Sequence, residues 1–68
     1  MIVVVNGVDQ TIAEDATVAD VAALAGIGGD ERGVAIALAG VVVPRDAWRT
    51  TLLAAGQRLE IVRATAGG

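Results

Sequence analysis

The two most apolar strand-like segments of this chain lie at opposite ends of its sequence, and this placement limits the folds open to it. Ile2–Val5 is a run of β-branched residues, and in Arg58–Arg63 the apolar Leu59 and Ile61 alternate with other side chains. Strands of this character are usually buried at the centre of a sheet. We therefore expect the first and last strands to be parallel neighbours in the middle of one mixed sheet.

Turn residues mark the strands between these two segments. Asn6-Gly7 is a strong hairpin signal, and residues 8–13 then form the returning strand, which is more polar and so nearer an edge. Residues 33–39 are predicted to be a further strand, and a turn leads from it into Val41–Val43. Pro44 ends that strand or confines it to an edge of the sheet.

One segment has the spacing of a short amphipathic helix. Thr17 is expected to cap its start, because Asp20 follows three positions later as in a capping box, and Gly26 is expected at its C-terminal cap. The apolar residues at helical spacing form one stripe: Val18, Val21, Leu24 and Ala25. A single-faced helix packs across one face of a sheet. The order of elements therefore predicts an α+β fold of the β-grasp type, with one helix packed across a four- or five-stranded mixed sheet.

Residues 33–39 alternate large and small side chains. The large aliphatic ones are expected to pack beneath the helix, whereas Ala35, Ala37 and Ala39 would form a flat, weakly polar surface on the opposite face of the sheet. An exposed apolar patch on a small protein suggests a docking site. The alternative, given equal weight, is that a neighbouring loop such as the one carrying Trp48 covers this surface.

The composition limits the chemistry that the chain can perform by itself. Its 68 residues suffice for one small domain, and they include no Cys, His, Lys, Ser or Tyr, so most covalent nucleophiles, the usual general base and the soft metal ligands are absent. Adjacent acids at Glu14-Asp15 and Asp30-Glu31 fall in expected surface loops, where carboxylates are usually just solvated. We therefore expect neither an enzyme nor a metal site.

Charge and hydropathy bear on partners and location. A formal net charge of −3 and a single aromatic residue argue against a nucleic-acid partner. The longest nearly apolar run, residues 34–43, is about half as long as a membrane-spanning helix. Together with the absence of cysteine and of a secretory signal, these features predict a cytoplasmic protein with no membrane partner.

The sequence ends in Gly67-Gly68 after the bridge Ala64-Thr65-Ala66. We divide the chain into a β-grasp domain over residues 1–63 and a flexible tail over residues 64–68. Because glycine lets the backbone pass where any Cβ would clash, this tail is expected to thread a narrow channel and present the carboxylate of Gly68 in another protein's active site. The alternative is an incidental terminus, since termini often end in small residues.

Several short motifs carry a resemblance to one known family. They are Asn6-Gly7, Thr17-Val18, Val34-Ala35-Ile36-Ala37-Leu38, Val43-Pro44-Arg45 with Trp48, Leu59-Glu60-Ile61-Val62, and Gly67-Gly68. Over essentially its whole length the chain resembles the bacterial sulfur carriers of thiamine biosynthesis, the ThiS family, which are ubiquitin-like β-grasp proteins. The Val-Pro-Arg-x-x-Trp segment with the terminal Gly-Gly is the most specific part. The departures lie in turns, where the family commonly has Asn, Ser and Asp and this chain has Ala39, Asp46 and Gln57.

The resemblance implies a protein carrier rather than an enzyme. A ubiquitin-activating-type (ThiF-type) adenylating enzyme would use ATP to convert the carboxylate of Gly68 into an acyl-adenylate. A persulfide sulfur donor would then displace AMP and leave a C-terminal thiocarboxylate, or 1-thioglycine. A ThiG-type thiazole synthase would receive the sulfur during formation of the thiazole ring. The chain itself would bind no cofactor.

Individual residues receive the following roles. Gly68 would carry the covalent attachment, and Gly67 and Ala66 would provide for threading of the tail. The candidate partner contacts are Trp48, Arg45, Ala35 and Ala37. For Trp48 a place in the small core is favoured over a partner contact, and Arg45 has a second interpretation, in which it fixes its turn.

Three other functions stay open beside the thiamine carrier. The first is a carrier for molybdopterin or another sulfur acceptor, and the second is a ubiquitin-like modifier whose Gly68 ends in an isopeptide bond. The third is a non-covalent docking module, in which the sheet surface matters and the Gly-Gly ending is incidental.

Overall fold

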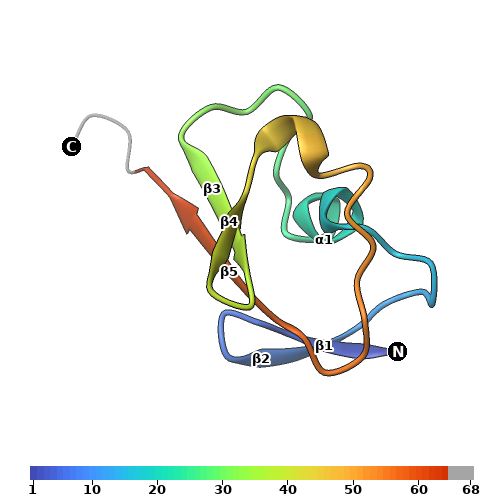
Figure 1. Cartoon of the computed structure of the whole chain (residues 1–68). Helices are drawn as coiled ribbons and strands as arrows, with labels where there is room; N and C mark the ends of the chain where they lie inside the picture. Colours follow the sequence, from blue (N-terminus) through green and yellow to red (C-terminus); the bar gives the residue numbers. More distant parts are fainter. Residues whose placement is uncertain (65–68) are drawn as a thin grey trace.

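A computed structural model describes residues 1–64 of the chain (Figure 1). The predicted attachment and threading residues Ala66, Gly67 and Gly68 therefore lie outside the described residues. The elements follow in the order β1 (Ile2–Val5), β2 (Val8–Thr11), α1 (Val18–Leu24), β3 (Val34–Leu38), β4 (Val41–Val43), the 3-10 helix η1 (Arg45–Ala47) and β5 (Arg58–Arg63). The predicted α+β fold, with one helix and a five-stranded mixed sheet, is confirmed.

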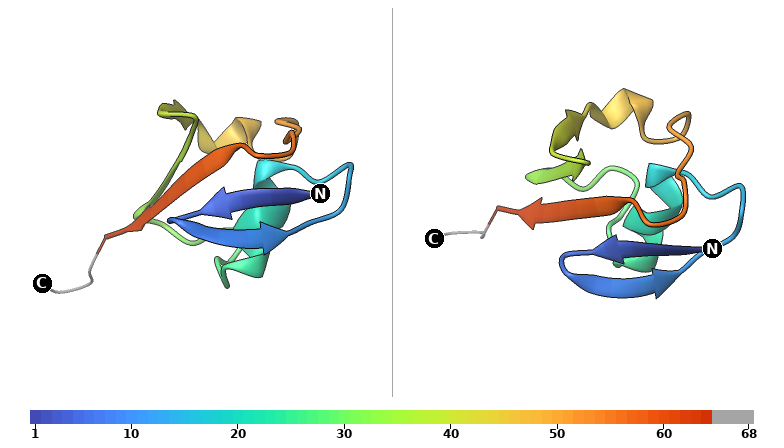
Figure 2. Two further views of the ribbon diagram at one scale, coloured as in Figure 1. Left: turned by 90° about the horizontal axis from the view of Figure 1, so that it is seen from below. Right: turned by 60° about the horizontal axis from the view of Figure 1, so that its bottom comes forward.

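The sheet has the strand order β2-β1-β5-β3-β4. The two terminal strands are parallel neighbours, as predicted, with Val5 opposite Leu59, and the other neighbouring pairs are antiparallel. Figure 2 shows β5 running beside β1 through the middle of the molecule. Pro44 follows β4 at the edge of the sheet, where its missing N–H removes no ladder hydrogen bond.

The Asn6-Gly7 hairpin forms as predicted. Asn6 has a φ of 50° and Gly7 a φ of 81°, the left-handed pair that a two-residue turn with native strand twist requires. The returning strand β2 ends at Thr11 rather than at residue 13, because Ile12 turns into the core and its backbone N–H donates to the carbonyl of Met1 at 2.8 Å.

Helix α1 begins with the predicted capping box. The backbone N–H of Thr17 donates to Asp20 Oδ2 at 2.8 Å, and the backbone N–H of Asp20 donates to Thr17 Oγ1 at 3.4 Å. At the other end Ala25 is the cap residue, and Gly26 follows it with a φ of 80°, the left-handed conformation that ends many helices.

The predicted stripe of α1 is only half correct. Val18 and Val21 are buried as expected, and Ala22 joins them, but Leu24 is 61% exposed and Ala25 is exposed as well. Leu24 lies about a third of a turn from Val18 around the helix, and Ala25 comes after the last residue of the helix. A two-turn helix therefore buries a narrower face than the spacing suggested.

The core lies between α1 and the central strands. Val3, Leu59 and Ile36, one from each of the three central strands, are fully buried and cluster with Val18 and Val21 of the helix. Each such side chain stabilises the fold by about 1.5–3 kcal/mol relative to an exposed one. This packing fixes β5 near its start, at Leu59, from which the strand runs on to Arg63.

Candidate functional site at the base of the C-terminal tail

Strand β5 carries the chain out of the domain. Its pairing with β1 covers only Arg58 and Leu59, whereas β3 stays paired with it up to Arg63. β5 therefore projects past the end of β1 (Figure 2). Ala64, the last described residue, donates its backbone N–H to the carbonyl of Gly33 at 2.6 Å, so the base of the tail is held by the residue that precedes β3.

Gly33 is required at this point by its conformation and its surroundings. Its φ is +74°, and a Cβ built on it would lie 3.1 Å from the Cβ of Ala64. Any other residue would be strained in this left-handed region and would press against the tail at its base. The left-handed φ also explains why β3 starts at Val34, one residue after the predicted start.

Arg63 and Glu31 form an ion pair beside this anchor. Arg63 Nε lies 3.0 Å from Glu31 Oε2, and its Nη2 donates to Glu31 Oε1 at 3.2 Å and to the carbonyl of Gly26 at 3.0 Å. Glu31 Oε1 also accepts from the backbone N–H of Gly28 at 3.1 Å. A partly exposed ion pair alone contributes little stability, but here each partner is also bonded to the backbone of the α1–β3 loop, residues 25–33.

Arg45 ties the same loop to the domain. Its guanidinium donates to the backbone carbonyls of Glu31, Gly28 and Gly29, at 2.6, 3.0 and 3.1 Å. The same group lies over the ring of Trp48, 4.2 Å from the ring centroid, in a cation–π arrangement. The structural role predicted for Arg45 is therefore present, although it fixes the α1–β3 loop rather than its own turn.

Trp48 lies in the core, as the favoured interpretation predicted. Only 5% of it is exposed, and its indole Nε1–H donates to the carbonyl of Val43 at 2.9 Å. The ring therefore closes the core beneath η1 and supports the guanidinium of Arg45. A partner contact at Trp48 stays a prediction, confined to its small exposed rim.

Ala35 and Ala37 lie on the face of the sheet that α1 does not cover. Ala35 pairs with Val62 and Ala37 with Val42, and these two valines are 62% and 65% exposed. We call these four residues the open-face patch. Since Trp48 lies on the other face, with the core, the patch is left exposed rather than covered by the loop that carries Trp48. Its use by a partner stays a prediction.

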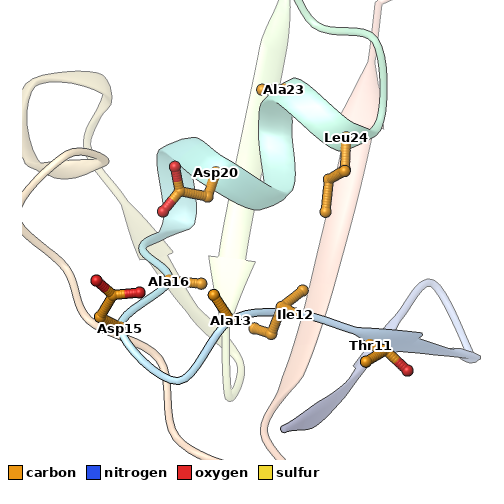
Figure 3. Close-up of a pocket in the computed structure, with 8 residues that line it drawn as sticks. All are labelled: Thr11, Ile12, Ala13, Asp15, Ala16, Asp20, Ala23 and Leu24. Carbon is orange, nitrogen blue, oxygen red and sulfur yellow. The ribbon is translucent and has the colours of Figure 1, made fainter.

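A shallow hollow lies on the helix side of the molecule, between α1 and the connection that leads into it from β2 (Figure 3). Its lining residues are Thr11, Ile12, Ala13, Asp15, Ala16, Asp20, Ala23 and Leu24. The side chain of Leu24 points from the helix toward Ile12, and the carboxylate of Asp20 is engaged in the helix cap. The hollow is therefore lined mainly by apolar side chains, and its polar groups are Thr11 and the carboxylates of Asp15 and Asp20.

Two further findings concern the described part of the chain. Within residues 1–64, no three side chains of His, Cys, Asp or Glu come together as they would around a metal ion. Over the same residues no helix has the length and apolar character needed to cross a membrane.

Comparison with known proteins identifies the family. The sequence model of the ThiS family matches residues 3–68. The chain belongs to the ThiS family. Its fold is similar to the crystal structure of the thiamine biosynthesis protein (ThiS) from Geobacter metallireducens, with 27% identity, a TM-score of 0.79 and full coverage, 100%, of both chains.

A solution structure of the same Geobacter metallireducens target agrees with the crystal structure. The solution structure of a thiamine biosynthesis protein from Geobacter metallireducens has 28% identity and a TM-score of 0.80, covering 100% of this chain and 88% of that one. Among curated proteins, none matches the chain with significance.

Within this ThiS-family fold, the residues that hold the base of the tail could not be predicted from the sequence. Glu31 was expected to be a solvated loop acid, but it is paired with Arg63, whereas its neighbour Asp30 has no ion pair or side-chain hydrogen bond to the described residues. No local pattern separates these two acids. Only the register of β3 against β5, with Val34 opposite Arg63, brings the arginine to this loop.

Proposed function

We propose that this ThiS-family chain is a sulfur carrier of thiamine biosynthesis, and that it is a protein co-substrate rather than an enzyme. The observation that carries the proposal is the family match, which runs through Gly67-Gly68 at the end of the sequence. The two similar structures, both of a thiamine biosynthesis protein from Geobacter metallireducens, favour the thiamine pathway over molybdopterin synthesis and over protein modification.

Activation is the first step of the proposed cycle. A carboxylate is a poor electrophile, so a ThiF-type adenylating enzyme joins an oxygen of the Gly68 carboxylate to the α-phosphorus of ATP and releases pyrophosphate. The product is an acyl-adenylate with AMP as a good leaving group. Gly67 and Ala66 suit this step, because small residues let the tail enter a narrow active site.

Sulfur transfer is the second step. The terminal sulfur of a partner's persulfide attacks the acyl carbon and displaces AMP, which gives an acyl disulfide. A thiol then attacks the partner's sulfur and breaks the S–S bond, so that the thiol and the partner are joined in a disulfide. The sulfur bonded to the acyl carbon stays on the carrier as a thiocarboxylate. That sulfur is the nucleophile delivered to a ThiG-type thiazole synthase.

The composition supports a cycle in which the partner enzymes supply the catalytic groups. The chain has no Cys, His, Lys, Ser or Tyr, so it lacks the side chains that usually act as nucleophile or general base. In the proposed cycle the only group of the carrier that reacts is its C-terminal carboxylate. All other reacting groups, and the ATP, belong to the partners.

Intact-mass spectrometry tests the proposal directly. The chain is incubated with ATP, a ThiF-type enzyme, a persulfide donor and a thiol, and we expect a mass increase equal to the replacement of one oxygen by sulfur. A chain that lacks Gly68 is expected to show no increase while keeping its fold. An unchanged mass of the full chain, with an enzyme that is active on another carrier, would contradict the proposal.

A further inference from the structure

We propose that Glu31 is a positioning residue for the C-terminal tail, and that the α1–β3 loop (residues 25–33) is a brace that fixes where the chain leaves the domain. The inference rests on the proposed function, because it concerns how the tail is presented to the adenylating enzyme.

The brace holds the end of β5 through two neighbouring residues. The carboxylate of Glu31 contacts Arg63 through both of its oxygens, at 3.0 and 3.2 Å. The backbone N–H of the next residue, Ala64, donates a hydrogen bond to the carbonyl of Gly33 at 2.6 Å. The side chain of one residue and the backbone of the following one are thus both fixed to the same loop.

The loop is in turn fixed to the core. Glu31 Oε1 accepts from the N–H of Gly28, so this carboxylate closes the loop on itself as well as binding Arg63. Arg45 donates to three loop carbonyls and lies over Trp48, which is buried. A continuous series of contacts therefore runs from the core through Arg45 and Glu31 to the base of the tail.

A fixed base has a consequence for binding. A segment that is already ordered loses less conformational entropy when it enters a partner's active site than one that moves freely. If Arg63 and Ala64 are released, these two residues must be ordered again when the carrier binds. This change weakens productive binding of the carrier without altering the reacting groups.

The experiment compares Glu31→Gln with Asp30→Asn, each of which removes one negative charge from the same loop. Adenylation is followed as ATP–pyrophosphate exchange by a ThiF-type enzyme, and hydrogen exchange of the Ala64 amide is followed in the free chain. For Glu31→Gln we expect faster exchange at Ala64 and a roughly three- to tenfold higher KM for the carrier, with kcat unchanged. Asp30→Asn is expected to match the wild type in both measurements.

Two results would overturn the inference while leaving the proposed function intact. The first is an unchanged KM for Glu31→Gln although exchange at Ala64 accelerates, which would make Glu31 purely structural. The second is an unchanged exchange rate at Ala64, which would mean that Glu31 does not hold the tail. Failure of the proposed function differs from both, since the wild-type chain would then support no pyrophosphate exchange with an enzyme that is active on another carrier.

Discussion

Two hairpin turns of this protein use the same backbone conformation with different residues. Asn6 and Ala39 have φ values of 50° and 51°, and each is followed by a glycine that also has a positive φ. Asparagine tolerates this left-handed region, whereas alanine is strained there by its Cβ. The chain thus has one well-matched turn, before β2, and one strained turn, before β4.

We predict that Ala39→Asn stabilises the protein by about 0.5–1 kcal/mol, because it relieves this strain. Urea unfolding measures the change. The matched control is Ala55→Asn, since Ala55 also precedes a glycine with positive φ but has no positive φ itself. Equal effects of the two substitutions would mean that the turn conformation at Ala39 is not the cause.

Asn6 has a second role at the residue scale. Its Oδ1 accepts from the N–H of Ile61 at 2.7 Å, and its Nδ2 donates to the carbonyl of Ile61 at 3.1 Å. The side chain therefore continues the β1–β5 pairing where the backbone turns away. We predict that Asn6→Gly, which keeps the turn, costs about 1–2 kcal/mol for the two lost hydrogen bonds.

Asn6→Asp separates these two bonds, because a carboxylate keeps the acceptor and loses the donor. Hydrogen exchange of the Ile61 amide is expected to accelerate in Asn6→Gly and to stay slow in Asn6→Asp. Fast exchange in both variants would contradict the prediction, because it would mean that the Oδ1 acceptor at position 6 does not protect the Ile61 amide.

At the scale of elements, the α1–β3 loop has no regular structure and depends on Arg45. We predict that Arg45→Lys lowers the unfolding free energy by about 1–2 kcal/mol, because an ammonium group cannot reproduce three separate carbonyl contacts together with stacking on Trp48. Arg49→Lys is the control, since Arg49 is exposed and has no side-chain hydrogen bond or ion pair among the described residues. Thermal unfolding followed by Trp48 fluorescence measures both variants, and equal losses would contradict the prediction.

The elements could be predicted from the sequence where their signals are local. Asn6-Gly7 and the Thr17–Asp20 capping box are complete within four residues, and the apolar character of β1 and β5 was enough to place them together. The exposure of Leu24 was missed, because spacing does not tell how wide a face of a short helix is buried.

The contacts of the candidate site could not be predicted in the same way. Arg45 is 14 to 17 residues from the carbonyls that it binds, and Arg63 is 32 residues from Glu31. Such pairs are fixed by strand register and loop path, which leave no pattern in the neighbouring residues. The contacts at the base of the tail are therefore set by the tertiary fold. The Gly67-Gly68 motif, by contrast, could be recognised from the sequence alone.

At the scale of the whole molecule, the two faces of the sheet differ. One face is covered by α1 (Figures 1 and 2) and by Trp48 in the core. The other face carries the open-face patch, beside the exposed Glu60, which pairs with Ala37. If partners dock on this face, as the sequence analysis predicted for Ala35 and Ala37, a charge placed there should weaken docking without unfolding the protein.

We predict that Ala35→Arg raises the KM of the carrier for the adenylating enzyme about tenfold, which corresponds to ~1.4 kcal/mol of binding free energy. Its unfolding free energy should change by less than about 0.5 kcal/mol, because the position is exposed. The control is Ala23→Arg, an exposed substitution on α1, on the other side of the sheet. A similar KM for the two variants would show that the open face does not dock this enzyme.

The parallel pairing of β1 with β5 has a consequence for how the protein is made. Asn6 and Ile61, which hold these strands together at the hairpin, are 55 residues apart in the sequence. Contacts of such separation form slowly, because nearly the whole chain must close into a loop first. During synthesis on the ribosome, β1 therefore has no central neighbour until β5 has emerged, and the hydrophobic core, to which β5 contributes the fully buried Leu59, closes only then.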